Sequence, residues 1–375
     1  MKKKKPNLEY CNICVLPNTR PNLKINGIKN CNCFVASQKK IDWLKRKKEF
    51  KEIIEKVKKR KSLYDCVIPV SGGKDSTWQT TIALNYGLKP LCVTWKTPAR
   101  TNIGKLNLEN LINLGVDHID FSLNPLIEKK FVLKTFKEFG NPLIPMHLAL
   151  HAIPTNIAIE KKIPLILWGE NSAYEYGGEQ KYKGAFMDNK WRKKFGVNEG
   201  KNIEYWVSKN LSKKDLMNYE IPSFSNIKKS NIFEVFLGHF FKWSPKKIYE
   251  IAKKKGFKSA RKPKTGIYNF ADIDDSFLIT IHHYMKWYKF GFSREWDNLS
   301  IEIRENNMSR KDAINTLENA GFKEPIKEID LFCKYLDITK SDFDKIIEIH
   351  RNRNIWYKKN NKWKIKDFLI ENWNW

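Results

Sequence analysis

The sequence contains no apolar run that approaches the ~18 residues of a membrane-spanning helix. The lysine-rich start leads into Pro6 and Asn7 rather than into the apolar segment of a signal peptide. Both absences predict a cytoplasmic protein without a membrane partner. At 375 residues, the chain is long enough for one α/β domain and smaller modules.

Acidic residues are too few to balance the basic ones, which leaves a formal net charge of +29. Clustered lysines can neutralise the phosphates of nucleic acids. Here, however, the basic residues are mostly Lys rather than Arg and accompany much Asn and Ile, as an AT-rich genome would produce. We interpret residues 2–5 as a solvated tail and residues 45–48 as a solvated helix face. A nucleic-acid partner is therefore the less favoured interpretation.

Cysteine is sparse after residue 33, whereas four of the seven cysteines lie within the first 33 residues. Disulfides are not expected in the cytoplasm, so this cluster favours a metal. Two residues separate Cys11 from Cys14, but only one separates Cys31 from Cys33. Four thiolates suit tetrahedral zinc, although the second pair departs from the usual spacing. We predict a zinc knuckle at residues 1–36, with free thiols or a labile cluster as alternatives.

Hydrophobic periodicity predicts the organisation that follows. Trp43, Phe50 and Val57 recur every seven residues and predict a linking helix within 37–61. The apolar runs that we expect to be strands are residues 66–70, 91–95, 118–121 and 165–168. Helical patterns at 75–86, 106–114, 126–139 and 147–161 separate them. This alternation predicts a Rossmann-like parallel sheet in a domain at 62–260, followed by a helical region at 261–375.

The first predicted strand runs into Ser71-Gly72-Gly73-Lys74-Asp75-Ser76, at the start of a helix. Amide groups at a helix N-terminus form an anion site, and the two glycines permit close approach of a phosphate. The Ser71 and Ser76 hydroxyls can donate to phosphate oxygens, while Asp75 can hold Mg²⁺. The spacing is not that of a Walker A motif and resembles the PP-loop of ATP pyrophosphatases. We therefore predict ATP binding with pyrophosphate as the leaving group, rather than an ordinary turn.

The fourth predicted strand ends at Trp168 and leads into Gly169-Glu170-Asn171. Parallel α/β sheets bind ligands at this edge, so Glu170 and Asn171 are candidates to face the nucleotide or substrate. An exposed turn capped by Asn171 is the plain alternative. Trp95 ends the second strand and is a candidate to border the adenine, or simply to pack in the core.

No cysteine in the sequence fits the nucleophile of a glutaminase. Residue 2 is Lys, and no cysteine lies in a glycine-flanked elbow. We interpret Cys66 and Cys92, which lie inside predicted strands, as buried and inert, whereas Cys333 lies in a predicted helical stretch. If the enzyme uses ammonia, another chain supplies it.

Several segments resemble PP-loop N-acetyl sugar amidotransferases of bacterial surface-glycan and flagellin-glycan biosynthesis. They include the PP-loop, the first cysteine pair with residues 15–21, and Gly169-Glu170-Asn171 with residues 175–178. The resemblance continues through Lys264-Thr265-Gly266 and through residues 289–294, followed by Asp297. It covers nearly the whole chain.

The resemblance implies that ATP adenylates the acetamido oxygen of a nucleotide-linked N-acetyl sugar and that ammonia then displaces AMP, which leaves an acetamidine. It also implies partners similar to the glutaminase and cyclase subunits of imidazole glycerol phosphate synthase. Lys74, Asp75 and Glu170 are the predicted catalytic residues, and Lys264 and Arg294 the predicted substrate contacts. The guanidinium of Arg294 suits a phosphate or carboxylate.

Two other functions compete with this one. Enzymes that thiolate tRNA can also join a cysteine knuckle to a PP-loop, but thiolation calls for further paired cysteines. A nucleotide sensor without turnover is the other alternative, and the intact Asp75 and Ser76 argue against it.

Overall fold

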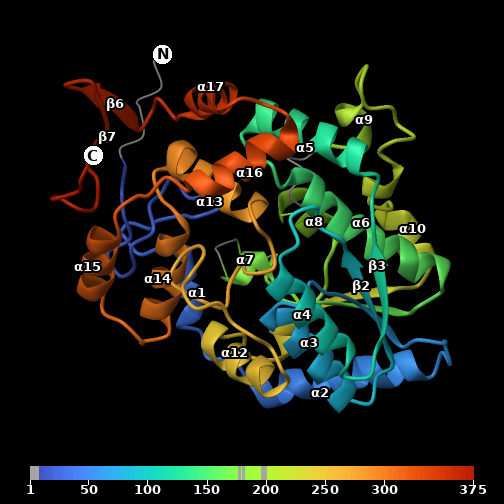
Figure 1. Ribbon diagram of the computed structural model, residues 1–375. Coiled ribbons are helices and arrows are strands. Elements are labelled where there is room, and N and C mark those ends of the chain that lie inside the picture. Colours follow the sequence, from blue (N-terminus) through green and yellow to red (C-terminus); the bar gives the residue numbers. More distant parts are fainter. Residues whose placement is uncertain (1–7, 176–178, 180–181, 196–200) are drawn as a thin grey trace.

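A computed structural model describes residues 8–175, 179, 182–195 and 201–375. Residues 2–5 of the predicted tail and residues 176–178 of the resemblance lie outside this range. The centre of the molecule is a five-stranded parallel sheet (Figure 1). Its strands are β1 (Cys66–Pro69), β2 (Pro90–Trp95), β3 (Asp117–Phe121), β4 (Leu165–Trp168) and β5 (Phe233–Phe236). The predicted Rossmann-like parallel sheet is confirmed.

The strands lie in the order β3-β2-β1-β4-β5. The chain therefore adds β2 and β3 on one side of β1, and then crosses over to add β4 and β5 on the other side. Open α/β sheets bind ligands at this switch point, beyond the carboxyl ends of the strands. The PP-loop follows β1 and Gly169 follows β4, so the topology brings the two motifs to the same place.

Helices cover both faces of the sheet. On one face, α5 (Pro125–Phe139) and α6 (Ile144–Glu160) pack over Val67 and Ile166. The other face, around Ile68 and Leu167, is covered by helices that come from separate parts of the chain. These are α2 (Trp43–Lys58), α3 (Lys74–Asn85), α4 (Asn102–Ile112), α11 (Leu237–Phe240) and α12 (Pro245–Lys254). Because both faces are covered, β2 and β4 are buried at every residue.

Local signals set both ends of α5. The Asn124 side chain accepts hydrogen bonds from the amides of Leu126 and Ile127 at the start of α5. Gly140 ends this helix in the left-handed conformation, with φ +57°. Short elements connect β4 to β5, and they were not predicted. They are α7 (Ser172–Glu175), α8 (Asn189–Phe195), α9 (Ile203–Trp206), the 3₁₀ turn Met217–Tyr219 and α10 (Phe224–Lys229).

The C-terminal region is helical, as predicted, but it also contains an antiparallel hairpin that was not predicted. Its helices are α13 (Leu278–Phe290), α14 (Arg294–Arg304), α15 (Arg310–Ala320), α16 (Ile326–Leu336) and α17 (Lys340–His350). The hairpin consists of β6 (Trp356–Lys359) and β7 (Lys362–Ile365). Buried side chains of α13, α16 and α17 belong to the same hydrophobic core as those of α5.

The cysteine-rich segment shares a hydrophobic core with this C-terminal region. Leu16 and Leu23 belong to the same buried cluster as Trp287, Phe292 and Trp296. Helix α1 (Asn32–Ser37) ends the segment, which lies against α14 and α15 in Figure 1. Residues 8–36 are therefore packed onto the C-terminal helices rather than standing as a separate module.

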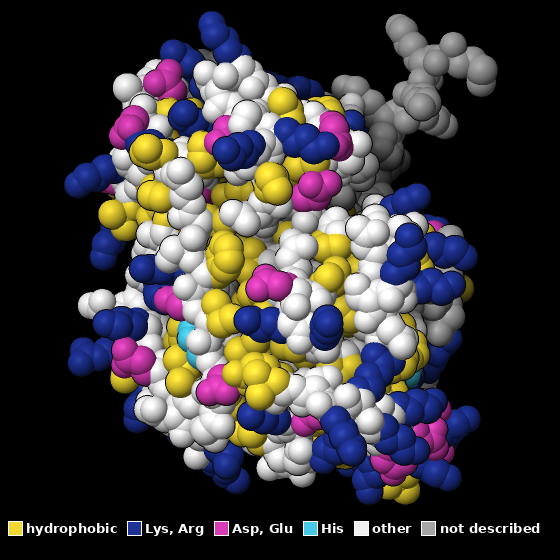
Figure 2. Space-filling model, turned by 90° about the vertical axis from the view of Figure 1, so that its right-hand side faces the viewer, with side chains coloured by type: hydrophobic (Ala, Val, Ile, Leu, Met, Phe, Trp, Pro, Cys, Tyr) yellow, Lys and Arg dark blue, Asp and Glu magenta, His cyan; other side chains and the backbone are white. Residues whose placement is uncertain are grey.

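The surface has no single basic stripe on the face shown in Figure 2, where the Lys and Arg side chains of the described residues are interspersed with acidic and apolar ones. In the described ranges, no helix is both long and apolar enough to cross a membrane.

Candidate functional site

The PP-loop forms a turn that leaves the start of α3 open. Gly72 has φ +83°, a conformation that favours glycine, and Gly73 is the N-cap of α3 without a side-chain hydrogen bond. The Gly73 amide donates to Ser71 Oγ at 3.2 Å. The first amides of α3 thus have no capping side chain, which is the arrangement that binds anions at helix N-termini.

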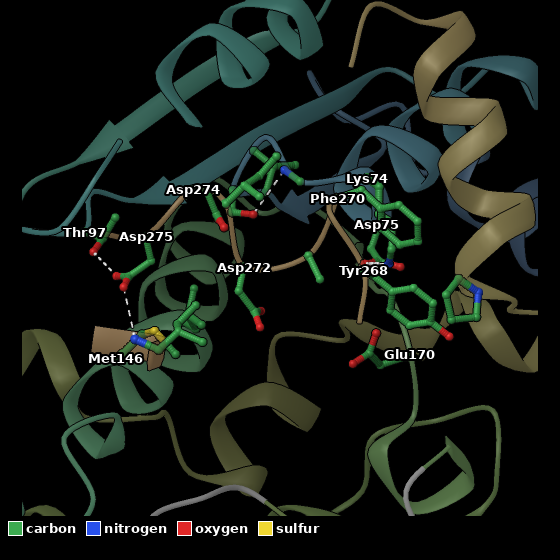
Figure 3. A pocket seen from close by; sticks show the side chains of 18 of the residues that line it. Lys74, Asp75, Thr97, Met146, Glu170, Tyr268, Phe270, Asp272, Asp274 and Asp275 are labelled. Carbon is green, nitrogen blue, oxygen red and sulfur yellow. Dashed lines mark hydrogen bonds and ion pairs between the residues drawn. The ribbon is translucent and has the colours of Figure 1, made fainter. Parts of the chain in front are cut away.

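A cavity of about 300 Å³ lies over this loop (Figure 3). Its size is at the lower end for ligand sites in proteins. It brings together Ser71, Gly73, Lys74, Asp75, Trp95, Glu170 and Arg294 from the predicted site. These residues come from three strand ends of the sheet and from α14.

Five of the predicted residues do not line the cavity, and four of these are Gly72, Ser76, Gly169 and Lys264. Gly72 is buried against the backbone of Leu108, and the Gly169 carbonyl accepts the amide of Gly238 at 2.9 Å. The Ser76 hydroxyl donates to the Gly73 carbonyl at 3.0 Å. Lys264 donates to the carbonyl of Asp275. Gly72 and Ser76 therefore shape the loop, and the structure does not show the Ser76 hydroxyl turned toward a phosphate.

Asn171 is the clearest departure from the predicted contacts. Its side-chain nitrogen donates to the carbonyl of Tyr182 at 2.9 Å, and its oxygen accepts from Trp191 Nε1 at 2.9 Å. The same oxygen accepts the amide of Ala173. Asn171 is buried and holds the segment after β4, so we correct its assignment from nucleotide contact to loop support.

Asp75 and Glu170 are the two acidic groups at the switch point, and Figure 3 shows them on the same side of the cavity. Asp75 accepts a hydrogen bond from Trp243 Nε1 at 3.0 Å and pairs with Lys74 Nζ at 2.5 Å. Burial raises the pKa of Glu170 to about 7, and the negative charge of Asp75 adds to this effect. A carboxyl group with this pKa suits proton transfer near neutral pH.

The far wall of the cavity comes from residues 268–275, which sequence reasoning missed. The hydroxyl of Thr97, after β2, donates to Asp275 at 3.3 Å, and the amide of Thr101 donates to the carbonyl of Asp274 at 3.0 Å. Burial raises the pKa of Asp275 to about 6. Asp272 lines the cavity between these aspartates and Glu170. The aspartates at positions 272, 274 and 275 stand out in a strongly basic sequence. Only the fold shows that their segment crosses the edge of the sheet.

Aromatic rings also line this wall. Tyr268 and Phe270 stack with ring centroids 4.9 Å apart, and Tyr249 extends the stack on the other side of Phe270, at 4.4 Å. Lys74 Nζ lies 5.7 Å from the Phe270 ring centroid. Such a stack offers a flat apolar edge to a planar ligand.

Trp95 borders the cavity, and a hydrogen bond of its ring nitrogen fixes the side chain. Its Nε1 donates to Glu128 Oε1 at 2.9 Å in the core. Burial raises the pKa of Glu128 to about 7. The Trp95 ring is therefore fixed in orientation at the edge of the cavity. Its contact with an adenine stays a prediction.

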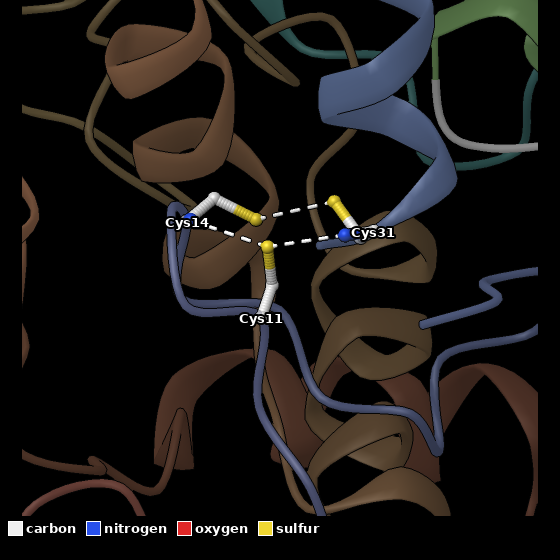
Figure 4. A group of neighbouring side chains, drawn as sticks. All are labelled: Cys11, Cys14 and Cys31. Atoms are coloured by element: carbon white, nitrogen blue, oxygen red, sulfur yellow. Dashed lines mark hydrogen bonds between the residues drawn. The ribbon is translucent and has the colours of Figure 1, made fainter. Parts of the chain in front are cut away.

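Three of the four predicted metal ligands lie together (Figure 4). The Sγ atoms of Cys11, Cys14 and Cys31 all lie within 4.8 Å of one another. The amides of Cys14 and Cys31 donate to Cys11 Sγ at 3.4 and 3.3 Å, which would support thiolates. Cys33 is buried nearby but is not part of this group. The donor set fits a thiophilic ion such as Zn²⁺, whose role would be to fix the knuckle.

The other three cysteines are buried, as predicted for Cys66 and Cys92, and none of them lines the cavity. Cys66 and Cys92 lie in β1 and β2, and burial raises the pKa of Cys92 to about 12. Cys333 lies in α16 and is also buried. All seven cysteines belong to the described residues and none lines the cavity, so this site has no thiol nucleophile.

Comparison with protein families supports the resemblance seen in the sequence. Residues 265–369 match the family described as "LPS biosynthesis protein WbpG-like, C-terminal domain". The C-terminal region is therefore similar to a WbpG-like domain. This region supplies Asp272 and Arg294 to the cavity, so it is part of the site rather than an appendage. Comparison with curated proteins found no match.

Solved structures with some similarity to the chain include three proteins. NMN synthetase from Francisella tularensis is 14% identical, with 60% of this chain and 100% of that chain covered and a TM-score of 0.28. A predicted tRNA methyltransferase subunit from Methanocaldococcus jannaschii is 18% identical, with 64% and 91% covered and a TM-score of 0.30. NH3-dependent NAD synthetase from Campylobacter jejuni is 16% identical, with 58% and 97% covered and a TM-score of 0.28.

Proposed function

We propose that this protein is an ATP-dependent amidotransferase acting on a nucleotide-linked N-acetyl sugar in bacterial surface-glycan biosynthesis. One observation carries the proposal: the PP-loop and the WbpG-like domain line the same cavity. A proposed ATP site and a region similar to a domain from lipopolysaccharide biosynthesis would thus share one cavity. The reaction would convert an acetamido group to an acetamidino group.

The chemistry divides into two displacements. In the first, the acetamido oxygen attacks the α-phosphorus of ATP, and pyrophosphate leaves. In the second, ammonia attacks the imidate carbon, and AMP leaves with the former amide oxygen. Adenylation is needed because an amide oxygen is otherwise a poor leaving group.

The residues of the cavity have separate roles in this scheme. The open amides of α3 and the Ser71 hydroxyl would bind the departing pyrophosphate. Asp75 would hold Mg²⁺, which neutralises phosphate charge, and Lys74 adds a positive charge beside it. Glu170 is suited to accept the proton that ammonia loses after its attack. Arg294 would contact the anionic part of the sugar nucleotide.

The cysteine positions disfavour tRNA thiolation. A sulfur-carrying cysteine must reach the activated substrate, and no cysteine reaches this cavity. The lack of such a thiol also agrees with ammonia from a separate glutaminase, which we include in the proposal together with a cyclase-like subunit.

The products of ATP cleavage test this function. With Mg²⁺, ammonium and a panel of nucleotide-linked N-acetyl sugars, the protein should release AMP and pyrophosphate only when a suitable sugar is present. In a matched reaction, tRNA and a sulfur donor replace the sugar. Release of ADP, or AMP formation that depends on tRNA instead of sugar, would refute the proposal.

A further inference from the structure

A buried group of charges connects the cysteine knuckle to the cavity wall. At its centre is Asp297 in the first turn of α14, whose side chain is 2% exposed. Arg20 Nε donates to Asp297 Oδ1 at 2.7 Å, and Lys286 Nζ donates to Oδ2 at 2.5 Å. Arg294 lies one helical turn before Asp297, with its guanidinium 4.0 Å from Oδ2. One carboxylate therefore faces three cationic side chains from three segments.

Arg294 lies close to two carboxylates. Its Nε lies 4.0 Å from Asp272 Oδ2, and its Nη1 makes the contact with Asp297. Asp272 in turn accepts the Thr265 hydroxyl and lies 3.5 Å from His283 Nε2. Both Arg294 and Asp272 line the cavity, whereas Asp297 does not. Asp297 thus acts on the cavity only through its neighbours.

The electrostatic effects agree with this geometry. Burial alone would raise the pKa of Asp297, but the charges of Arg20, Lys286 and Arg294 hold this pKa below its usual value. Burial also acts to raise the pKa of Asp272, but the hydrogen bond from His283 and the charge of Arg294 lower it. Both aspartates are therefore anionic and able to orient the guanidinium.

Close packing further restricts Arg294. Gly266 has φ +61°, and a Cβ at this position would lie 3.0 Å from Arg294 Cγ and even closer to Asn298 Oδ1. The Asn298 oxygen accepts the amide of Ile267 at 3.2 Å. The loop around Gly266 therefore lies directly on the Arg294 side chain.

The knuckle is fixed to the same helices by other contacts. The Thr19 hydroxyl donates to the Phe290 carbonyl at 2.6 Å, at the end of α13. Arg310 Nε lies 3.4 Å from the carbonyl oxygens of both Cys11 and Cys14. Arg20 thus extends from a segment anchored on both sides, and it does not reach the cavity itself.

We propose that Asp297 is a positioning residue that fixes the Arg294 guanidinium in the cavity wall, and that Arg20 makes the cysteine knuckle part of this device. The anion that Arg294 receives would be a phosphate of the sugar nucleotide, and this part rests on the proposed function. The knuckle would then tune substrate binding without contacting the substrate.

Asp297→Asn tests this positioning role because it removes the negative charge of the side chain and keeps its shape. The matched control is Glu234→Gln, which breaks the buried pair of Glu234 with Arg192 away from the cavity. Using UDP-N-acetylglucosamine as the probe, we expect Asp297→Asn to weaken sugar-nucleotide binding roughly tenfold or more, with ATP affinity changed less than about twofold. Glu234→Gln should lower the melting temperature but change neither affinity.

Arg20→Ala provides the second variant, should Asp297→Asn fail to fold. It should produce the same ligand-selective loss from outside the cavity, and Arg20→Lys should restore part of it. Equal losses for ATP and the probe, or no loss in either variant, would overturn the proposal.

A crystal structure of the folded variant separates this proposal from the proposed function. Arg294 should turn away from its wild-type position toward Asp272, whether or not any sugar nucleotide binds. An unmoved Arg294 would overturn the positioning role. Failure of the wild type to bind any nucleotide sugar would instead overturn the proposed function alone.

Discussion

Gly72 provides the sharpest test of the PP-loop geometry. A Cβ added at this position would lie 2.5 Å from the backbone nitrogen of Leu108 and 2.8 Å from its Cα. Neither atom can move without shifting α4. The residue also has φ +83°, which costs a non-glycine residue ~1–2 kcal/mol. Overpacking adds ~1–3 kcal/mol, so Gly72→Ala should destabilise the protein by ~2–5 kcal/mol.

A substitution at Gly115 measures the backbone cost without the overpacking cost. This glycine has φ +94° but no atom within 4 Å of an added Cβ, so Gly115→Ala carries the backbone cost alone. Urea unfolding of both variants should show Gly72→Ala to be less stable than Gly115→Ala by ~1–3 kcal/mol. A displaced loop should also slow AMP release by ~100-fold in Gly72→Ala only. Equal stabilities together with normal turnover would refute the geometry of this loop.

Three further predictions concern groups in the site and the knuckle. Asp75→Ala should reduce AMP-forming turnover by at least ~100-fold, and a near-normal rate would remove Asp75 from the mechanism. Burial raises the pKa of Glu170 from 4.5 to about 7, so the folded protein binds more protons than the unfolded chain in this interval and loses stability as pH rises. Glu170→Gln should therefore gain stability relative to the wild type between about pH 5 and about pH 8, and a pH-independent difference in melting temperature would contradict this. Metal analysis should find one zinc ion per chain at the cysteine knuckle, and its removal should unfold residues near Cys11 first in hydrogen exchange; protein with neither zinc nor iron would refute the site.

The parts of the fold that the sequence predicts are those with strong local signals. The apolar runs of β1 to β4 are short-range patterns, and these strands appear where expected. β5 was missed because Glu234 interrupts the apolar pattern of Phe233–Phe236 and because the strand lies among short helices. The hairpin of β6 and β7 was missed because its outward residues are mostly lysines, which resemble an exposed loop.

The site was predictable only in part, for a similar reason. The rule that ligands bind beyond the carboxyl ends of strands predicts from the strand pattern alone that Asp75 and Glu170 lie together, and both line the cavity. The same rule misassigned Asn171, because strand position does not reveal that an amide side chain is saturated by nearby groups of the protein. Asp272 and the ion pair of Arg20 with Asp297 depend on contacts across most of the chain, which periodicity does not encode.

The most direct test of the proposed reaction follows the acetamido oxygen. A nucleotide-linked N-acetyl sugar labelled with heavy oxygen in its acetamido group is incubated with ATP, Mg²⁺, ammonium and the protein, and the products are analysed by mass spectrometry. The heavy oxygen should appear in AMP, and the sugar product should be lighter by the exchange of this oxygen for NH. Unlabelled AMP, with the heavy oxygen retained in the sugar, would contradict it.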